Sequence, residues 1–297
     1  MTTVAASDAP APAVAPPAAG RDAPRSRSRR GRGRRQSTVL GLRRDLPGSG
    51  RAIAIAGGIA SIVGLWALAS TVFSTGASFS VPTIAATWDA LVEMHQEGTL
   101  WTDFRASVRR VGIGYGISLL IGVGLGVLIG SFASGQYFLE PQLGFLRYIP
   151  ASALTPLFLI WMGIDETPKI ALIVVGTVFY NILMVADVVR AVPMPLINAA
   201  YTVGAGRLTI LRRVILPHSW PGIIDVARIN LAAAWLMLVV AELLAAQDGL
   251  AFRIIRAQRF RRIDRMFALL LVFGLLGMIS DVVLRWLRRR TSPWAES

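Results

Sequence analysis

The sequence contains no cysteine, a single lysine and only two histidines among its 297 residues. The lack of cysteine excludes disulfide bonds and thiolate metal sites, and His95 and His218 are too few for a histidine-based metal centre. Lys169 has no glycine before it in the arrangement of the phosphate-binding loop GxxxxGK[ST], so the chain lacks that ATP-binding motif. We therefore expect no cofactor in this chain, and any nucleotide energy must enter through another polypeptide.

Charged residues are scarce as well. They make up 16% of the chain against 54% hydrophobic residues, and the mean hydropathy is +0.56. This balance does not fit a water-soluble domain and predicts a membrane protein. The apolar runs lack the alternation of polar and apolar residues that strands of a membrane barrel show, so the predicted fold is all-α and polytopic.

Residues 1–51 have a different composition from the rest. The first twenty are rich in alanine and proline, and residues 21–51 contain eleven arginines. Such a segment cannot bury enough apolar surface to order itself, so we expect a disordered cytoplasmic arm. Its arginines favour a role in membrane topology and contact with anionic lipid over nucleic-acid binding, because an apolar run follows at once; an arm without any function is the remaining alternative.

Residues 52–290 are expected to form a transmembrane domain, followed by a cytoplasmic tail at 291–297. Runs of about twenty apolar residues are long enough to cross a hydrocarbon core of about 30 Å. Gly122, Gly126 and Gly130 recur every four residues, which favours close approach of a neighbouring helix. Pro150 and Pro156 predict a kink in the third run. The six predicted spans are about 52–73, 107–132, 142–162, 169–190, 223–246 and 266–287.

The basic residues between the spans predict the orientation. With the amino terminus inside, nineteen of the 31 basic residues fall on the cytoplasmic side, and six spans then leave both termini there. The segment 247–265 conflicts with this rule, because it carries six arginines and falls outside. Arg253, Arg256 and Arg259 recur every three residues and predict a basic stripe on a helix, either at the outer mouth of a transport path or against lipid headgroups.

Residues 196–222 interrupt the apolar sequence with a polar, basic, glycine-containing stretch. We expect a short helix over 196–203, a break at 204–206 and a second helix from Arg207 that Pro217 ends. Leu208, Leu211 and Ile215 are predicted to share one face of that second helix. Such an elbow suits a soluble protein partner, an interfacial position on the lipid or a simple connection.

The spacing of Ala199, Ala200, Gly204 and the sequence Ile215-Leu216-Pro217 resembles the EAA loop of the permease subunits of binding-protein-dependent ABC importers. The resemblance covers about residues 80–294 and is strongest to the branch with nitrate, sulfonate, taurine and bicarbonate permeases. Asn198 stands where this family usually has an acidic residue. The segments that carry the branch resemblance are 146–164, 212–223, 234–250 and 292–294.

The resemblance implies the fold and the partners of such a permease. It implies a type I importer permease in the cell inner membrane, working with a second permease subunit, two copies of an ATP-binding subunit that binds ATP and magnesium, and a solute-binding protein. The chain itself would not be an enzyme. The residues that the resemblance assigns to coupling with the ATPase are Asn198, Ala199, Ala200, Gly204, Ala205, Arg207 and Pro217.

Ionisable residues within the predicted spans indicate a transport path or internal pairs, because charge is costly in a bilayer. Arg147 suits an anionic solute, whereas Glu242 is more suited to orienting helices, and an internal structural pair is open for both. Two other function classes also stay open: a six-span secondary transporter without an ATPase, and a membrane-bound enzyme or scaffold. The first would leave the hairpin at 196–222 without a purpose, and the second lacks a catalytic constellation.

Overall fold

A computed structural model describes residues 48–73 and 80–296 of the chain. The expected arm lies outside these residues except for positions 48–51, which form the first turn of a helix. The chain divides into two compact units, Met1–Gly58 and Ile59–Ser297. The helices are α1 (Gly48–Val72), α2 (Ile84–Gln96), α3 (Thr99–Ser131), α4 (Ala133–Leu146), α5 (Thr155–Met162), α6 (Glu166–Arg190), α7 (Met194–Thr202), α8 (Arg207–Ile210), α9 (Leu216–Ala245), α10 (Leu250–Arg259) and α11 (Ile263–Thr291).

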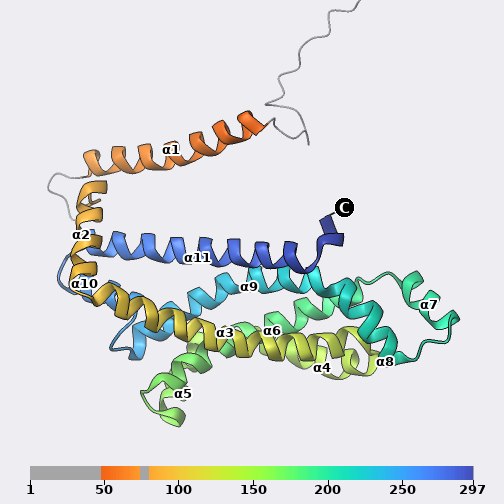
Figure 1. Ribbon diagram of the computed structural model, residues 1–297. Coiled ribbons are helices and arrows are strands. Elements are labelled where there is room, and N and C mark those ends of the chain that lie inside the picture. The colour runs from red at the N-terminus through yellow and green to blue at the C-terminus, as the bar shows by residue number, and fades with distance from the viewer. Residues whose placement is uncertain (1–47, 74–79, 297) are drawn as a thin grey trace, which may run out of the picture. The chain divides into compact units, whose positions relative to one another are not determined.

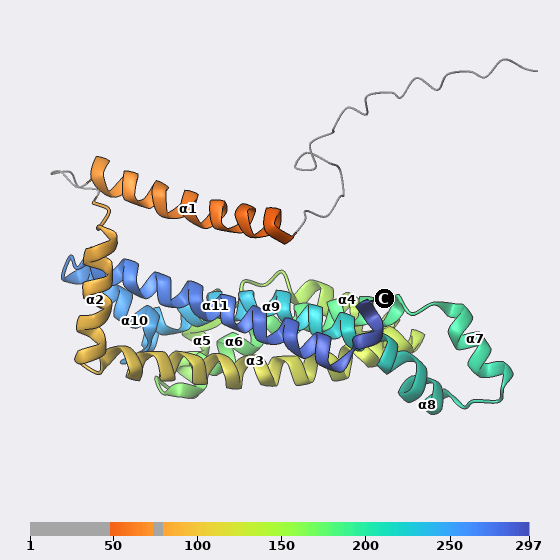
Figure 2. The same cartoon turned by 45° about the horizontal axis from the view of Figure 1, so that its top comes forward.

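Within the described residues all regular structure is helical, which confirms the predicted fold class (Figure 1). Among residues 48–73 and 80–296, five helical segments are long and apolar enough to cross a membrane, and α4 with α5 makes a sixth if this bent pair counts as one span. The helices α3, α6 and α9 lie side by side in both ribbon views (Figure 2). The short helices α7 and α8 lie at one end of this group, and α2 and α10 at the other.

The glycines of α3 explain why α6 lies so close to it. A Cβ atom added to Gly126 would come within 2.7 Å of the Ile182 carbonyl oxygen, and one on Gly122 within 2.5 Å of the Asn181 Cβ atom. A Cβ atom added to Gly130 would lie 2.6 Å from the Val189 Cβ atom. Small residues let two backbones approach where the lipid supplies no hydrophobic drive for association, so the glycine row is the contact surface for α6.

Hydrogen bonds between two buried amides and a buried hydroxyl join three of the spanning helices. The Asn181 side chain on α6 donates from Nδ2 to the Ser118 hydroxyl on α3 at 2.9 Å and accepts at Oδ1 from Asn230 Nδ2 on α9 at 2.8 Å. All three residues are buried. Unsatisfied polar groups are costly inside a bilayer, so side chains that satisfy one another hold their helices in one register.

The break expected near Pro150 and Pro156 is present between α4 and α5, which are bent by 77°. Helical geometry is unfavourable for the residue that precedes a proline. Ile149 precedes Pro150 and lies in a tightened turn, in which its N–H donates to the Leu146 carbonyl at 3.1 Å. A 3-10 turn at Ala151–Leu154 follows, and Pro156 lies in the first turn of α5, where a proline costs nothing.

The structure corrects one prediction about the hairpin: Pro217 does not end a helix. The turn Leu211–Ile215 has π-helical geometry and runs directly into α9, so one continuous helical segment extends from Arg207 past Pro217 and Pro221. A proline clashes with the carbonyl one α-turn before it. The wide π-turn moves those carbonyls away, and Pro217 then sits in the first turn of α9.

The start of the second span also differs from the prediction. The helix α3 begins at Thr99, not near residue 107, and its first two turns contain the charged residues Asp103 and Arg105. They are helical because Asp103, Ser107 and Arg110 lie on one face at helical spacing and are all buried against other elements.

Candidate functional site

The helices α7 and α8 and the turn between them, residues 194–210, form a tip at one end of the helix bundle. A left-handed glycine closes its turn. Gly204 has φ +81°, and the backbone N–H groups of Gly204 and Ala205 donate to the carbonyls of Tyr201 and Ala200 at 2.9 and 3.0 Å. This pair of bonds is the Schellman motif, which satisfies the last carbonyls of a helix and requires a left-handed residue. No neighbouring atom lies within 4 Å of a Cβ placed on Gly204, so its backbone angle, not crowding, favours glycine.

The inner side of the tip is packed against the bundle. Ala200 and Ala205, the two alanines that the Schellman bonds join, both contact a buried cluster. Residues of α8 and the π-turn complete this contact, so the tip is fixed to the ends of α6 and α9. The buried members of the cluster are Val185, Val189, Val192, Ile210, Ile215, Ile223 and Val226.

The outer side of the tip exposes apolar side chains. Val203 is 82% exposed and Leu208 57%, and Tyr201 is half exposed. Leu208 was expected to share one face of its helix with Leu211 and Ile215. That expectation is wrong, because the π-turn at Leu211–Ile215 changes the helical spacing after Leu208, and Ile210 takes the buried position in α8.

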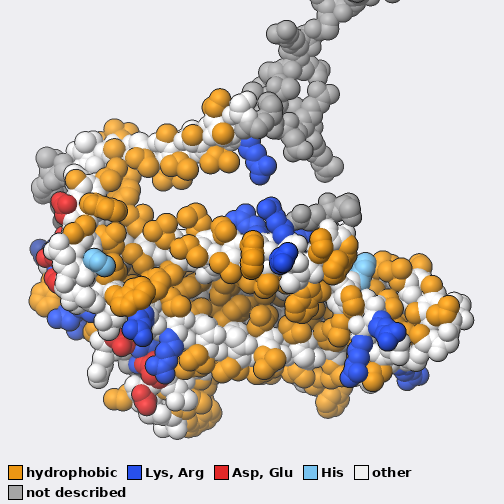
Figure 3. All heavy atoms as spheres, in the orientation of Figure 1, with side chains coloured by type: hydrophobic (Ala, Val, Ile, Leu, Met, Phe, Trp, Pro, Cys, Tyr) orange, Lys and Arg blue, Asp and Glu red, His pale blue; other side chains and the backbone are white. Residues whose placement is uncertain are grey.

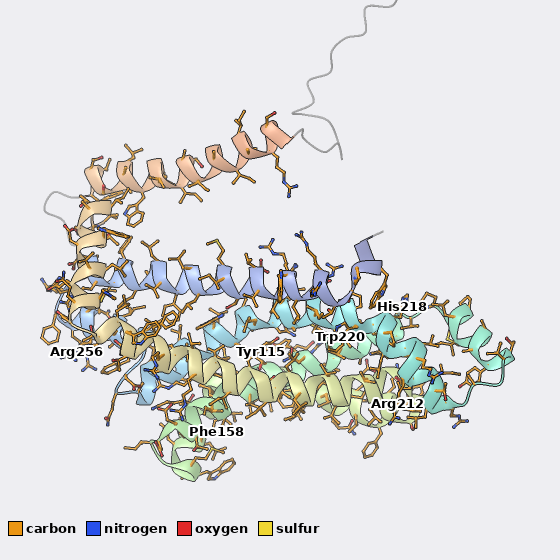
Figure 4. The ribbon with its side chains drawn as sticks, viewed as in Figure 1. Tyr115, Phe158, Arg212, His218, Trp220 and Arg256 are labelled. Carbon is orange, nitrogen blue, oxygen red and sulfur yellow. The ribbon has the colours of Figure 1, made fainter. Side chains whose placement is uncertain are left out.

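The predicted coupling residues therefore divide between two sides of one small structure. Asn198, Ala199, Gly204 and Arg207 are exposed, whereas Ala200 and Ala205 are half-buried. Pro217 is exposed in the first turn of α9, away from the tip. Arg212 and Arg213 add exposed positive charge beside the tip; Arg212 is labelled in Figure 4 at the end of the molecule opposite Arg256.

The far end of the bundle contains a buried ionic cluster around Arg110, which is 1% exposed. Its guanidinium binds Glu242 on α9 at 2.9 Å and Glu166 at the start of α6 at 2.7 Å, and it also binds the Asp248 carboxylate between α9 and α10. One arginine thus joins three helices and a loop. Sequence reasoning missed Arg110, although Asp103, Ser107 and Arg110 at helical spacing were a signal that could have found it.

Glu242 has all its hydrogen bonds within the protein. Its Oε1 atom accepts from the Ser107 hydroxyl at 2.7 Å and from Arg110, and its Oε2 atom accepts from the Ala251 N–H at 2.9 Å. Gly249, with φ +118°, faces the same carboxylate so closely that a Cβ atom would collide with it. This arrangement leaves no free oxygen for a solute and suits the alternative of an internal structural pair.

Other charges of the spans that lie near helix ends are paired. Arg228 on α9 binds Asp281 on α11 at 3.1 Å, and Arg190 binds Glu140 at 2.9 Å and Asp187 at 3.0 Å. The Arg228–Asp281 and Arg190–Glu140 pairs join neighbouring helices.

Arg147, at the break after α4, differs from these residues because no carboxylate lies within 4.0 Å of it among the described residues. Its Nη2 atom donates to the Tyr148 hydroxyl at 3.1 Å, and its guanidinium carbon lies 5.0 Å from the centre of the same ring. A charged side chain at the centre of a bilayer costs at least about 2.5–3.5 kcal/mol. An aromatic contact offsets only part of that cost.

The predicted basic stripe lies on α10, but its three arginines have different surroundings. Arg253 is ion-paired with the buried Asp103 at 2.5 Å and is 14% exposed. Arg256 and Arg259 are exposed. A cavity of about 490 Å³ lies here, lined by Arg253 and Arg256 together with Arg262, Arg265 and Glu97. Figure 3 shows acidic and basic side chains gathered at the end that carries α2 and α10.

A second set of ion pairs joins α2 to the start of α11. Arg262 binds Glu93 at 2.6 Å, and Arg265 binds Glu93 at 2.8 Å and Glu97 at 2.6 Å. Hydrogen bonds from Arg262 and Arg265 hold the pKa of Glu93 below its usual value. The hydrogen bonds that Arg262 donates to Asp264 and Glu93 raise the pKa of Arg262, so the pair is charged at neutral pH.

Comparison with protein families decides the identity of the chain. Residues 118–293, more than half of the chain, match the family described as the binding-protein-dependent transport system inner membrane component. The chain belongs to this family. It is a permease of the ABC importer type, as the EAA-like loop implied, and the alternatives of a secondary transporter and of a membrane-bound enzyme are set aside.

Individual relatives agree with this assignment. The permease is 33% identical to a protein of Bacillus subtilis described as an aliphatic sulfonates transport permease, SsuC, over 80% of this chain and 83% of the relative. It is 36% identical to the taurine transport system permease protein TauC of Escherichia coli, over 67% and 72%. Among solved structures, the MetNI methionine ABC transporter in an inward-facing conformation shares the fold, with a TM-score of 0.57 and 19% identity over 71% of this chain and 99% of that one.

Proposed function

We propose that the permease imports its solute by coupling to a separate ATP-binding subunit through residues 194–216. That subunit would bind ATP and magnesium and hydrolyse the ATP, and this chain would perform no covalent chemistry. The observation that carries the proposal is the tip at Gly204, which is fixed to α6 and α9 on one side and exposes Val203, Leu208 and Tyr201 on the other. An exposed apolar knob on a rigid support suits a groove of a soluble partner.

The proposed assembly contains two copies of this permease, two ATP-binding subunits and one solute-binding protein. Closure of the ATP-binding subunits would push the two tips together, and the rigid attachment of each tip to α9 would pass this motion to the spans. The family description and the relatives' names support an importer that receives its solute from a binding protein.

The proposed orientation places both termini and the tip in the cytoplasm, with α2 and α10 outside. The arginines of the amino-terminal arm, the tip and the end of α11 support it, because basic residues concentrate on the cytoplasmic side. The arm would then lie against anionic lipid. The absence of cysteine permits a direct test, because single cysteines at positions 209 and 258 can be labelled without interference from native thiols.

The proposed solute is a small anion of the sulfonate, taurine or nitrate type. The relatives' names support this class, and so does the basic cavity bounded by Arg256 on α10. In this proposal Arg147 contacts the solute within the membrane, Arg256 and Arg259 attract it at the outer mouth, and Glu242 orients helices. Arg253, expected as part of the rim, would instead hold α10 on α3 through Asp103.

The coupling proposal can be tested by co-purification with the ATP-binding subunit. Leu208→Asp and Val203→Asp place charge on the exposed side of the tip and are expected to abolish co-purification. The matched control is Phe260→Asp, which changes a side chain that is 71% exposed at the opposite end. Co-purification that survives both tip variants, or that fails equally in the control, would contradict the proposal.

A further inference from the structure

A cavity of about 410 Å³ lies at the α4–α5 break. The Tyr180 hydroxyl on α6 donates to the Arg147 carbonyl at 3.4 Å, which fixes the depth of the break relative to α6. Tyr180 is fourteen residues from the first residue of α6 and ten from the last. At 1.5 Å per residue it lies about 21 Å from one end and about 15 Å from the other, so the break is close to the middle of the span.

The lining of this cavity combines one cation with hydroxyl groups and apolar walls. Arg147, Tyr148 and Ser152 come from the break, and Tyr180 from α6. Val175, Phe179, Ala233 and Met237 form much of the remaining wall. A few polar groups in an apolar cavity are typical of sites for small ligands.

In the part of the chain that the structure describes, no carboxylate pairs with the positive charge of Arg147. The Arg147 Nε atom is buried and has no hydrogen-bond partner, whereas Arg110, Arg190 and Arg228 in other helices all bind carboxylates. An ionisable residue within a membrane span points to a functional site when no internal partner explains it. The group that would complete this site is an anion with at least two oxygen atoms, because the arginine fork donates paired hydrogen bonds.

Met237 sets the size of the space beside the charge. Its side chain covers Gly176 on α6, where an added Cβ atom would lie 2.5 Å from Met237 Cγ. Methionine is flexible and adapts to apolar groups of different length. An inorganic anion such as nitrate would leave this apolar wall without a contact, whereas a short alkyl chain would cover it.

We propose that this cavity is a solute site of the permease for a small organic monoanion, with the anionic head at Arg147 and an aliphatic tail against Met237. Alkanesulfonates have this chemistry. The inference rests on the proposed function. It adds the place of binding, the kind of head group and the residue whose side chain limits the length of the aliphatic tail. It also assigns the irregular backbone between α4 and α5 a purpose, since membrane proteins retain such backbone where it lines a site or cavity.

The test is direct binding to the assembled permease and ATP-binding subunits, without solute-binding protein, in discs of neutral phosphatidylcholine. Methanesulfonate, butanesulfonate and hexanesulfonate serve as probes in calorimetric titrations. Arg147→Gln is expected to weaken the binding of all three at least tenfold, and Arg147→Lys to restore part of it. Met237→Ala should raise the affinity ratio of hexanesulfonate to methanesulfonate severalfold. Arg109→Gln, which changes an exposed arginine of α3 that does not line this cavity, serves as a control with unchanged binding.

Several outcomes would overturn the inference. One is unchanged sulfonate binding in Arg147→Gln, and another is an unchanged affinity ratio of hexanesulfonate to methanesulfonate in Met237→Ala. A third is a wild-type complex that binds no sulfonate but retains phosphatidylglycerol in a way that depends on Arg147, which would identify a lipid site. If Arg147→Gln fails to assemble, Arg147→Lys and Met237→Ala still decide the matter. Failure of the proposed function is separate, because it would appear as loss of the ATP-binding subunit from the wild-type complex.

Discussion

The Arg110 guanidinium and the Glu242 carboxylate form a buried ion pair at 2.9 Å, although 132 residues separate them in the chain. Removing one partner of such a pair leaves the other charge buried and unpaired, which costs about 3–5 kcal/mol. Arg110→Gln is therefore expected to lower the melting temperature of the detergent-solubilised permease markedly. The neighbouring Arg109→Gln changes an exposed arginine on the same helix and should have little effect. Equal melting temperatures for the two variants would refute a stabilising role of the pair.

Gly204→Val should uncouple transport from ATP hydrolysis while leaving membrane insertion intact. A β-branched side chain is strained at φ +81°, so the Schellman closure of the tip would be lost. Gly204→Asn should retain more transport, because asparagine tolerates the left-handed region. Gly206, with φ −72° and open space around it, provides the control Gly206→Ala. Vesicles in which Gly204→Val imports at the wild-type rate would disprove this prediction.

Gly126→Leu is expected to prevent α3 from packing on α6. The added side chain would meet the Ile182 carbonyl and Val185, both about 2.7 Å from the Cβ position. The control is Gly124→Leu on the same helix, where nothing lies within 4 Å of an added Cβ atom. Monodisperse protein after size-exclusion chromatography should be lost only in the Gly126 variant; equal recovery of both would show that the close approach is dispensable.

Neutralising Arg256 and Arg259 together should reduce uptake most at low ionic strength. Exposed charges act on a solute over a Debye length of about 8–10 Å, and salt weakens that action. Arg253→Gln should behave differently, because Arg253 is paired with the buried Asp103. Its expected effect is a salt-independent loss of assembled permease. A salt-independent loss of uptake in the double variant would favour anchoring to lipid headgroups.

The Glu93 pair predicts a pH dependence of stability. Since arginine contacts lower the pKa of Glu93 in the folded chain, its stabilising contribution is complete above the usual glutamate value of 4.5 and is lost as the pH falls through the lowered pKa. The melting temperature of Glu93→Gln should therefore lie below that of the wild type at pH 7, and the difference should close below about pH 4.5. A difference that is constant down to pH 3 would assign the effect to something other than ionisation.

Much of this architecture was predictable because local composition determines it. The hydropathic runs locate the long helices, the spacing of Gly122, Gly126 and Gly130 predicts the contact with α6, and Pro150 predicts the break. These features depend on residues that are close in the sequence.

Other features were not predictable, because they depend on contacts across the sequence. The charged residues at the start of α3 are accommodated in a buried helix because Asp103 pairs with α10 and Arg110 with three carboxylates from later segments. The place of Pro217 depends on the π-turn before it, and a proline alone gives no sign of such a turn. The same turn explains why Leu208 does not share the buried face of Ile215.

The π-turn has a mechanical consequence. It makes Arg207–Leu243 one helical rod of 37 residues, with the apolar tip near one end and Glu242 at the other. At 1.5 Å per residue the rod is about 55 Å long, so tilting it by about 10° about its midpoint displaces each end by about 5 Å in opposite directions. In the proposed mechanism, such a lever would convert inward pressure on the tip into outward movement of the helix end that holds the Arg110 cluster.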